Sequence, residues 1–342
     1  MPDAVNKARL KSRKRMLLGM LGIVLILVLS FGGWVYKAKT QRDLNRQLIA
    51  VVLDGDAEAA QSLLKRGADP NIRNVPEQPL SLLQLIRHAF HKDSKTAQDH
   101  MDSESRTMLE MALDIDGEHD PENENVALVK VLLDAGARTE DSSFCHQTPL
   151  MWAISYDRLQ TVQTLLDHGA DLLAKDDRAQ LPIYFLNDRG TDELKIAELL
   201  VKRGSDVNAV DYKGTTPLMN LIGGRKEDLQ VVQFLIAHGA DVNARSQGGY
   251  SALLVSTDIQ DSQITRLLLE HGAEVNVYDF KDKNSALQKA VEHDSLQEIA
   301  MLIAYGADVN HRNKAGETAL SLAKKQNYPK RIRLLEAAGA KQ

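Results

Sequence analysis

Residues 211–244 read DYKGTTPLMNLIGGRKEDLQVVQFLIAHGADVNA, one complete unit of a pattern that recurs along the chain. Gly214 lies in a sequence typical of a turn, because glycine adopts a positive φ angle without steric strain. Pro217 predicts a helix start, because the first helical position loses no hydrogen bond to proline. Apolar residues around Leu235 follow a one-face spacing, which predicts a second helix. Gly239 then predicts the end of that helix.

The same ending recurs at a nearly fixed interval. From Gly136 onward the terminal glycines are 33, 35, 35, 33, 34 and 33 residues apart. A repeat of this length predicts a stacked solenoid, in which each unit packs on its neighbours. The endings are Gly67-Ala68-Asp69, Gly136-Ala137-Arg138, Gly169-Ala170-Asp171, Gly204-Ser205-Asp206, Gly239-Ala240-Asp241, Gly272-Ala273-Glu274, Gly306-Ala307-Asp308 and Gly339-Ala340.

Two further motifs stand in register with these endings. A helix-starting Thr-Pro-Leu occurs twice, and related triplets occupy the same place in other units. A Val-Asn step follows four of the Gly-Ala-Asp-type endings. The helix starts are Thr148-Pro149-Leu150, Leu181-Pro182-Ile183, Thr216-Pro217-Leu218, Ser251-Ala252-Leu253, Ser285-Ala286-Leu287 and Thr318-Ala319-Leu320, and the steps are Val207-Asn208, Val242-Asn243, Val275-Asn276 and Val309-Asn310.

With these motifs the chain resembles the ankyrin repeat family over residues 41–342. The resemblance implies an all-α solenoid of about eight to nine helix-pair units that binds a protein and catalyses nothing. The family's usual His after Thr-Pro-Leu is absent, so we expect weaker bracing of the turns. The residues at that place are Met151, Tyr184, Met219, Leu254, Gln288 and Ser321.

The interval from Gly67 to Gly136 is 69 residues, enough for two units. Pro79-Leu80 could open one helix pair and Thr107-Met108-Leu109 another. We expect an irregular or inserted segment at about 91–125, either a degenerate repeat or a helical insertion. The repeat domain would otherwise run over residues 37–342.

Residues 16–36 are uncharged and largely aliphatic. At about 1.5 Å per residue they span roughly 30 Å, the thickness of a bilayer core, which predicts one transmembrane signal anchor. Six Lys/Arg precede the run within residues 1–15, against the single acid Asp3. This favours a cytoplasmic N-terminus and a periplasmic repeat domain at the inner membrane. The alternative is a cleaved signal peptide, with Ser30-Phe31-Gly32 as a weak site.

The composition of the chain excludes some classes of partner and of structural site. The chain carries 47 Asp/Glu and 42 Lys/Arg, and residues 1–15 hold six of the basic ones, so the repeats are acidic. A nucleic-acid partner is not expected, because it would require a basic surface. Cys145 is the only cysteine, which excludes an internal disulfide and a thiolate zinc cluster. No Asn-x-Ser/Thr sequon occurs, which favours a bacterial envelope protein over a eukaryotic luminal one.

Motifs for catalysis, nucleotides or metals are absent from the sequence, and no cofactor or small-molecule substrate is predicted. His88 and His91, with His100 or Asp99, are weak metal candidates, and an acidic loop at 114–125 departs from the calcium-binding pattern. A metal-dependent accessory enzyme is therefore an unfavoured alternative. His168, His238 and His271 each precede a terminal glycine, where the helix dipole favours positive charge.

The resemblance implies that the turn tips and first helices line a concave binding surface. Tyr and Arg are enriched at interface hot spots, so aromatic and charged residues at these exposed places are the candidates. The alternative is that turn-tip aromatics pack on the neighbouring turn. An immunity protein against a periplasmic toxin or hydrolase is a narrower functional alternative. The candidates are Phe144, Gln147, Tyr156, Arg178, Arg189, Tyr212, Lys213, Tyr250, Lys281, Glu292 and His293, with Tyr278 and Phe280 beside them.

Overall fold

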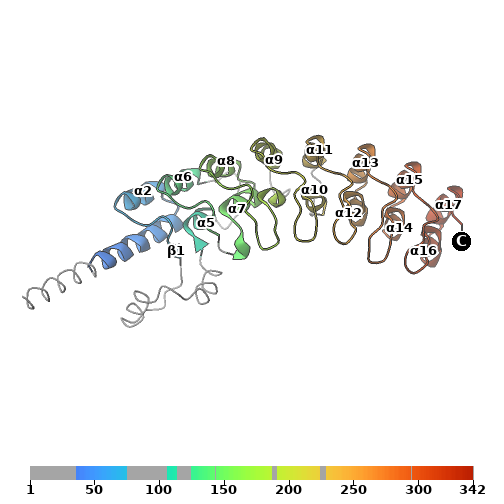
Figure 1. The fold of residues 1–342 in the computed structure, drawn as a ribbon, viewed down its shortest axis with the longest axis horizontal. Coiled ribbons are helices and arrows are strands. Elements are labelled where there is room, and N and C mark those ends of the chain that lie inside the picture. Colours follow the sequence, from blue (N-terminus) through green and yellow to red (C-terminus); the bar gives the residue numbers. More distant parts are fainter. Residues whose placement is uncertain are drawn as a thin grey trace, which may run out of the picture.

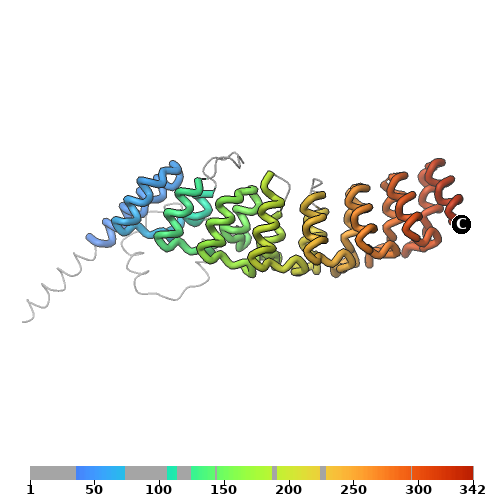
Figure 2. Tube along the Cα trace, turned by 90° about the horizontal axis from the view of Figure 1, so that it is seen from above, coloured from blue at the N-terminus to red at the C-terminus, as the bar shows by residue number. Residues whose placement is uncertain are grey.

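The computed structural model describes residues 36–74, 106–113, 125–142, 144–186, 191–223, 229–293 and 295–341. These residues form a solenoid of helix pairs that confirms the expected all-α repeat architecture, with eight pairs in the described part of the chain. The row of second helices arches over the row of first helices, and the turns between units extend beneath the first helices (Figure 1). Figure 2 shows the same stack from above, running without a break from the N-terminal to the C-terminal units.

The first helices are short and form the inner row. Apart from residues 36–53, they are α5 (Met108–Leu113), α7 (Pro149–Ser155), the 3₁₀ helix η2 (Pro182–Phe185), α10 (Pro217–Ile222), α12 (Ala252–Ile259), α14 (Ala286–Glu292) and α16 (Ala319–Lys325). The second helices form the outer row and are α2 (Ala57–Lys65), α6 (Val126–Asp134), α8 (Leu159–Asp167), α9 (Glu193–Lys202), α11 (Leu229–Ala237), α13 (Ser262–Glu270), α15 (Leu296–Ala304) and α17 (Pro329–Ala337).

Local sequence explains where these helices begin and end. Thr216 caps α10 by accepting from the Met219 N–H, and Pro217 follows at the first helical position. At the other end of the unit, Gly239 has φ +90° and closes α11. His238 fills the expected place at that end, with its Nδ1 2.8 Å from the Phe234 carbonyl.

One continuous core runs through the stack. Leu235 of α11 is completely buried, as are Leu200 of α9 and Leu268 of α13 in the flanking units. Each second helix also contacts the second helix of the next unit, so a unit buries its apolar face mainly against its neighbours.

The long interval between Gly67 and Gly136 contains one described helix pair, α5 and α6. The second helix α2 packs directly on α6, so these two are neighbours in the described part of the stack. The two-residue strands β1 (Arg73–Asn74) and β2 (Arg106–Thr107) pair antiparallel, which adds a small sheet to the expected all-helical fold. The helix start predicted at Thr107-Met108-Leu109 is present, whereas Pro79-Leu80 lies outside the described residues.

Two of the residues that replace the missing His brace the turns in another way. The Tyr184 hydroxyl lies 2.7 Å from the carbonyl oxygens of both Ala209 and Thr215 in the next unit, where it donates. Gln288 Nε2 donates to the Glu317 carbonyl at 2.7 Å. The expected loss of bracing therefore does not apply to these two units.

The Val-Asn step has a structural explanation that the sequence did not provide. Asn208 donates from Nδ2 to the Gly239 carbonyl and accepts at Oδ1 from the Asp241 N–H, both at 2.8 Å. Asn71, Asn243 and Asn276 make the same pair of bonds to the next unit. These asparagines form a ladder that joins successive units along the outer loops.

In the described ranges no helix is both long and apolar enough to cross a membrane. The span expected at residues 16–36 lies outside the described residues except for Tyr36.

Candidate functional site

The turn tips beneath the first helices form one edge of the molecule, which we call the finger edge. Each tip is joined to the preceding one by a single backbone hydrogen bond. The bonds run from Asp177 N to Cys145 O, Tyr212 N to Arg178 O, Gln247 N to Lys213 O, Phe280 N to Gly248 O, and Lys314 N to Asp282 O, at 2.8–3.1 Å. The finger edge comprises residues 144–147, 176–180, 211–215, 246–250, 279–285 and 313–317.

Side chains inside the turns hold each tip in one conformation. Asp211 Oδ1 accepts from the N–H groups of Lys213 and Thr215 at 2.8 Å. Asp176 and Asn313 bind the corresponding groups of their own turns in the same way. Such Asx turns fix the backbone before any ligand arrives, which lowers the entropic cost of binding.

A hollow lies between two neighbouring turns and the first helices α10 and α12, with a volume of about 330 Å³. It brings together two residues predicted from the sequence, Lys213 and Tyr250. The sequence did not indicate two other lining residues, Met219 and Val255. Their apolar spacing is that of ordinary core positions in helices α10 and α12. The lining is Lys213, Thr215, Met219, Ser246, Gln247, Gly248, Tyr250 and Val255.

The predicted aromatic residues differ in their exposure. Tyr212 is 52% exposed at its turn tip, with Lys213 Nζ 5.3 Å from the ring centroid. Tyr250 is half-buried and packs against the core. Tyr156 is half-buried and stacks on Trp152 with ring centroids 5.6 Å apart. Tyr212 is thus the member of this set best placed to meet a partner.

Phe280 and Tyr278 extend the aromatic surface to the next turn. Phe280 is 52% exposed, yet one face of its ring lies against Gly249, where an added Cβ would come within 2.5 Å of the ring. Arg245 lies 5.5 Å from the Phe280 centroid. Lys283 Nζ lies 5.1 Å from the same ring and 4.9 Å from the Tyr278 ring. Phe280 therefore packs on its neighbour, as the alternative expected, although about half of its surface stays exposed.

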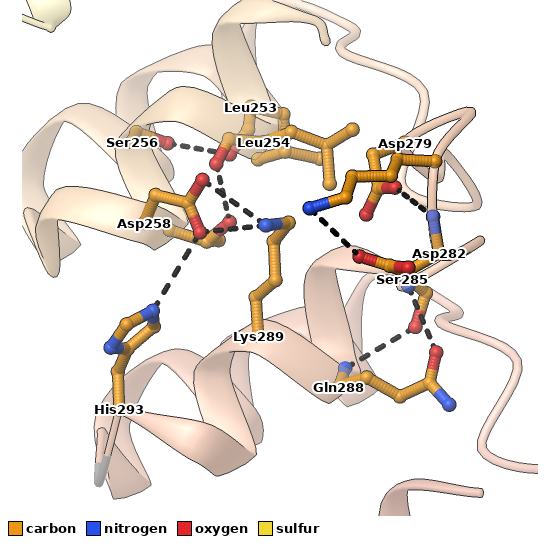
Figure 3. Close-up of polar contacts among 12 residues, drawn as sticks. Leu253, Leu254, Ser256, Asp258, Asp279, Asp282, Ser285, Gln288, Lys289 and His293 are labelled. Atoms are coloured by element: carbon orange, nitrogen blue, oxygen red, sulfur yellow. Dashed lines mark hydrogen bonds and ion pairs between the residues drawn. The ribbon is translucent and has the colours of Figure 1, made fainter. Parts of the chain in front are cut away.

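An ion-pair cluster lies on the inner helices beside Tyr250. Lys289 of α14 binds both carboxylate oxygens of Asp258 on α12, at 2.8 and 3.1 Å (Figure 3). His293 Nε2 is 3.6 Å from Asp258 Oδ1, and Lys289 Nζ is 5.1 Å from the Tyr250 centroid. Burial lowers the pKa of Lys289, but the hydrogen bond and charge of Asp258 outweigh it, so the pKa lies above its ordinary value.

The sequence had singled out His293 in this cluster but not its partners. Lys289 and His293 are four residues apart on one helix, so they share a face, and that spacing was the available signal. The side chain of Lys289 is only 9% exposed. The cluster thus links α12 to α14, and His293 and Asp258 are its partly exposed members.

The remaining candidates lie apart from the hollow. Arg178 and Lys281 are exposed at turn tips, Glu292 is exposed at the end of α14, and Gln147 is half-buried before the cap of α7. Arg189 and the Phe144 side chain lie outside what the structure describes. The binding role of each candidate stays a prediction.

Over the described ranges, no group of three or more His, Cys, Asp or Glu side chains could hold a metal ion. His88, His91, Asp99 and His100 lie outside these ranges, as does most of the acidic loop at 114–125.

Comparison with known proteins matches the repeats described above. A family model for ankyrin repeats in three copies matches residues 48–176 and 189–279. A second model, for ankyrin repeats in many copies, matches residues 287–336. No curated protein matches the chain.

Proposed function

Because the chain belongs to the ankyrin-repeat family, we propose that it is a non-catalytic interaction module that binds one protein partner on its concave face. The observation that carries the proposal is the hollow between two turns, with Lys213 and Tyr250 in its lining and Tyr212 at its margin. Tyr212 is 52% exposed on this rigid edge, and Tyr is enriched at interface hot spots.

A membrane anchor forms the second part of the proposal. The uncharged run at residues 16–36, with six basic residues before it, supports a single-pass anchor with a cytoplasmic N-terminus. The repeats would then lie on the periplasmic side of the inner membrane. Tethering would raise the effective concentration of the module toward partners in that compartment.

Affinity capture of the detergent-solubilised full chain tests the binding function. The wild type is compared with Tyr212→Ala/Tyr250→Ala, and with Tyr305→Ala as the matched control, since Tyr305 is 45% exposed at the end of an outer-row helix. All three must show the same circular dichroism spectrum. We expect one dominant partner that the double variant loses and the control keeps. Equal capture by all three proteins would overturn the concave-face assignment.

Protease treatment of intact spheroplasts tests the topology separately. We expect the repeats to be digested while a cytoplasmic marker protein survives. Repeats that stay intact until the membrane is lysed would replace the periplasmic placement with a cytoplasmic one.

No described residue gives particular support to the immunity alternative. That hypothesis relied on an acidic surface that could cover a basic active-site cleft, whereas the finger edge carries charges of both signs. Its exposed charged residues are Arg178, Lys213, Lys281, Lys283 and Lys314 together with Asp177 and Asp282.

A further inference from the structure

The first helix of the solenoid, residues 36–53, has charges of opposite sign near its two ends. Residues 36–46 contain four cations and one carboxylate, whereas residues 47–58 contain three carboxylates and no lysine or arginine. The basic end is the one that directly follows the uncharged run at residues 16–36. The cations are Lys37, Lys39, Arg42 and Arg46, and the carboxylates are Asp43, Asp54, Asp56 and Glu58.

Packing of this helix leaves its cations exposed to solvent. The buried face consists of Leu44, Leu48 and Val52, which are spaced four residues apart. Three of the cations follow the spacing i, i+3, i+7 from residue 39, so they share a different face of the helix. All four are exposed. Of these, residues 37, 39 and 42 form no ion pair with any residue that the structure describes.

Two further cations lie beside the basic end of the helix. Helix α2 ends at Lys65, and Arg66 follows it, with both side chains exposed. Gln41 Nε2 donates to the Gly67 carbonyl at 2.7 Å, which holds the end of α2 beside the second turn of the first helix. We call the six cations at this end the collar. Its members are Lys37, Lys39, Arg42, Arg46, Lys65 and Arg66, and the carboxylates at the same end are Asp43 and Asp69.

The distance from the expected membrane span determines what the collar can reach. A helix rises about 1.5 Å per residue, so Lys39 and Arg42 lie about 5 and 9 Å beyond Tyr36, the last residue of the uncharged run. The headgroup region on each side of the hydrocarbon core is roughly 5–8 Å thick. Long Lys and Arg side chains extend toward such an interface, and Tyr is enriched there. With the span inserted, the collar lies at the level of the phospholipid headgroups.

Positive charge alone would not distinguish this end of the molecule, because the C-terminal unit exposes cations as well. In that unit Lys324 pairs with Glu336 at 3.4 Å and Lys325 with Glu317 at 2.9 Å. It also lies at the opposite end of the stack from the first helix, which is dark blue in Figure 1. The collar is distinguished by its position directly after the uncharged run.

We propose that the collar binds anionic phospholipid headgroups and thereby holds the N-terminal unit of the solenoid against the membrane surface. This inference rests on the membrane anchor of the proposed function and adds a second contact with the bilayer. Each Lys or Arg near an anionic surface contributes to binding, and the attraction falls off within a Debye length. The same surface repels the acidic run at 54–58, so the basic end of the helix faces the membrane.

Contact with headgroups can be measured on the full chain reconstituted into vesicles. A fluorophore is attached at Gln47→Cys in a Cys145→Ser background, because Gln47 is exposed beside the collar and is not a member of it. A quencher is carried by a small fraction of the headgroups. The vesicles consist of phosphatidylcholine alone or of an equal mixture of phosphatidylcholine and phosphatidylglycerol. The collar variant is Lys37→Gln/Lys39→Gln/Arg42→Gln, and the control variant, which removes three exposed cations of the C-terminal unit, is Lys330→Gln/Arg333→Gln/Lys341→Gln.

We expect the wild type and the control variant to be quenched more strongly in the vesicles that contain phosphatidylglycerol, and added salt to remove the difference. In the collar variant the ratio of docked to undocked molecules should fall at least roughly tenfold. All three proteins must unfold at the same temperature within error. Quenching that does not depend on phosphatidylglycerol, or an equal loss in both variants, would overturn the collar assignment.

Alkaline carbonate extraction of the same vesicles tests the anchor separately. Wild type that stays with the lipid but shows no effect of phosphatidylglycerol would overturn the collar assignment and leave the anchor in place. Wild type that carbonate releases, yet that floats with the phosphatidylglycerol vesicles at neutral pH, would overturn the anchor and support the collar. Release by carbonate without flotation would overturn both.

Discussion

Glu298 of α15 is fully buried, in a small group of polar side chains from α12 and α13. The Thr265 hydroxyl is 3.3 Å from Glu298 Oε1 and 2.9 Å from Ser256 Oγ. Oε2 finds no hydrogen-bond partner among the described residues. Burial, only partly offset by the bonds from Thr265 and Ser295, raises the pKa of Glu298 to about 7. A carboxyl group in this setting destabilises the fold once it ionises.

The pH dependence of stability follows from this shift. Below the unfolded pKa the group is protonated in both states and costs nothing. As the pH rises from 4.5 to about 7, the unfolded chain releases the proton first, so the free energy of unfolding falls. At higher pH the loss is at most about 3 kcal/mol. We expect Glu298→Gln to stabilise the protein at about pH 8 and to change little at about pH 4.

Thermal unfolding of wild type and Glu298→Gln across this pH range is the measurement. Glu274→Gln serves as the control, because Glu274 is exposed. Parallel stability curves for the wild type and Glu298→Gln would show that folding does not raise the pKa of Glu298.

The asparagine ladder is interrupted at two consecutive units, where Glu140 and Leu173 replace asparagine. Leu173 occupies the ladder place in the loop after α8, and its side chain is 66% exposed. An alkyl side chain cannot bond to the Gly204 carbonyl or the Asp206 N–H, the groups equivalent to those that Asn208 binds. In the preceding unit Glu140 supplies half of the link, accepting from the Asp171 N–H at 2.8 Å.

We expect Leu173→Asn to restore the link and to stabilise the protein by about 1 kcal/mol, since each net hydrogen bond contributes roughly 0.5–1.5 kcal/mol. Chemical denaturation measures the change. Asn208→Leu, the reverse substitution one unit later, should destabilise by a similar amount. If both variants shift stability in the same direction, the ladder is not what the substitutions act on.

Two turns of the finger edge allow a packing effect to be separated from backbone strain. Gly249 and Gly316 have φ angles of +79° and +78°, so alanine is strained to a similar degree at both. Only at Gly249 would the new methyl collide with the Phe280 ring. We expect Gly249→Ala to destabilise by about 1–3 kcal/mol more than Gly316→Ala. Thermal unfolding of both variants measures this difference, and equal losses would show that the Phe280 ring is free to move away.

The positions of most helices and turns were predictable from the register of the repeated motifs. The places of Thr216, Pro217 and Gly239 predicted where helices begin and end, because caps and terminal glycines act locally. The contacts of Tyr184 with the next unit and of Lys289 with Asp258 were not predictable, because each depends on which side chains adjacent units bring together. For the same reason the sequence indicated Lys213 and Tyr250 but not the hollow that they share with Met219.

The solenoid has no single central core, and the stability of each unit depends on its contacts with the neighbouring units. Leu235 is fully buried in the core of its unit, and α11 contacts both α9 and α13. We expect Leu235→Ala to cost about 2–5 kcal/mol. The loss should extend to adjacent units, since each is stabilised by its interfaces.

Amide hydrogen exchange measures how far that effect spreads. Faster exchange is expected in α9, α11 and α13, with α2 and α17 little changed. Loss of protection confined to α11 would mean that the units are more independent than the continuous core indicates.

The row of bonds between turn tips has a direction. In each of the five rungs, an N–H of the later turn points to a carbonyl of the earlier one, from Lys314 back to Cys145. The peptide dipoles of the rungs therefore add along the solenoid, as they do along a helix axis, with the positive end toward the N-terminal units. The two ends of this margin are electrically different, so a partner bound along it would experience opposite fields in its two possible orientations and should adopt one of them.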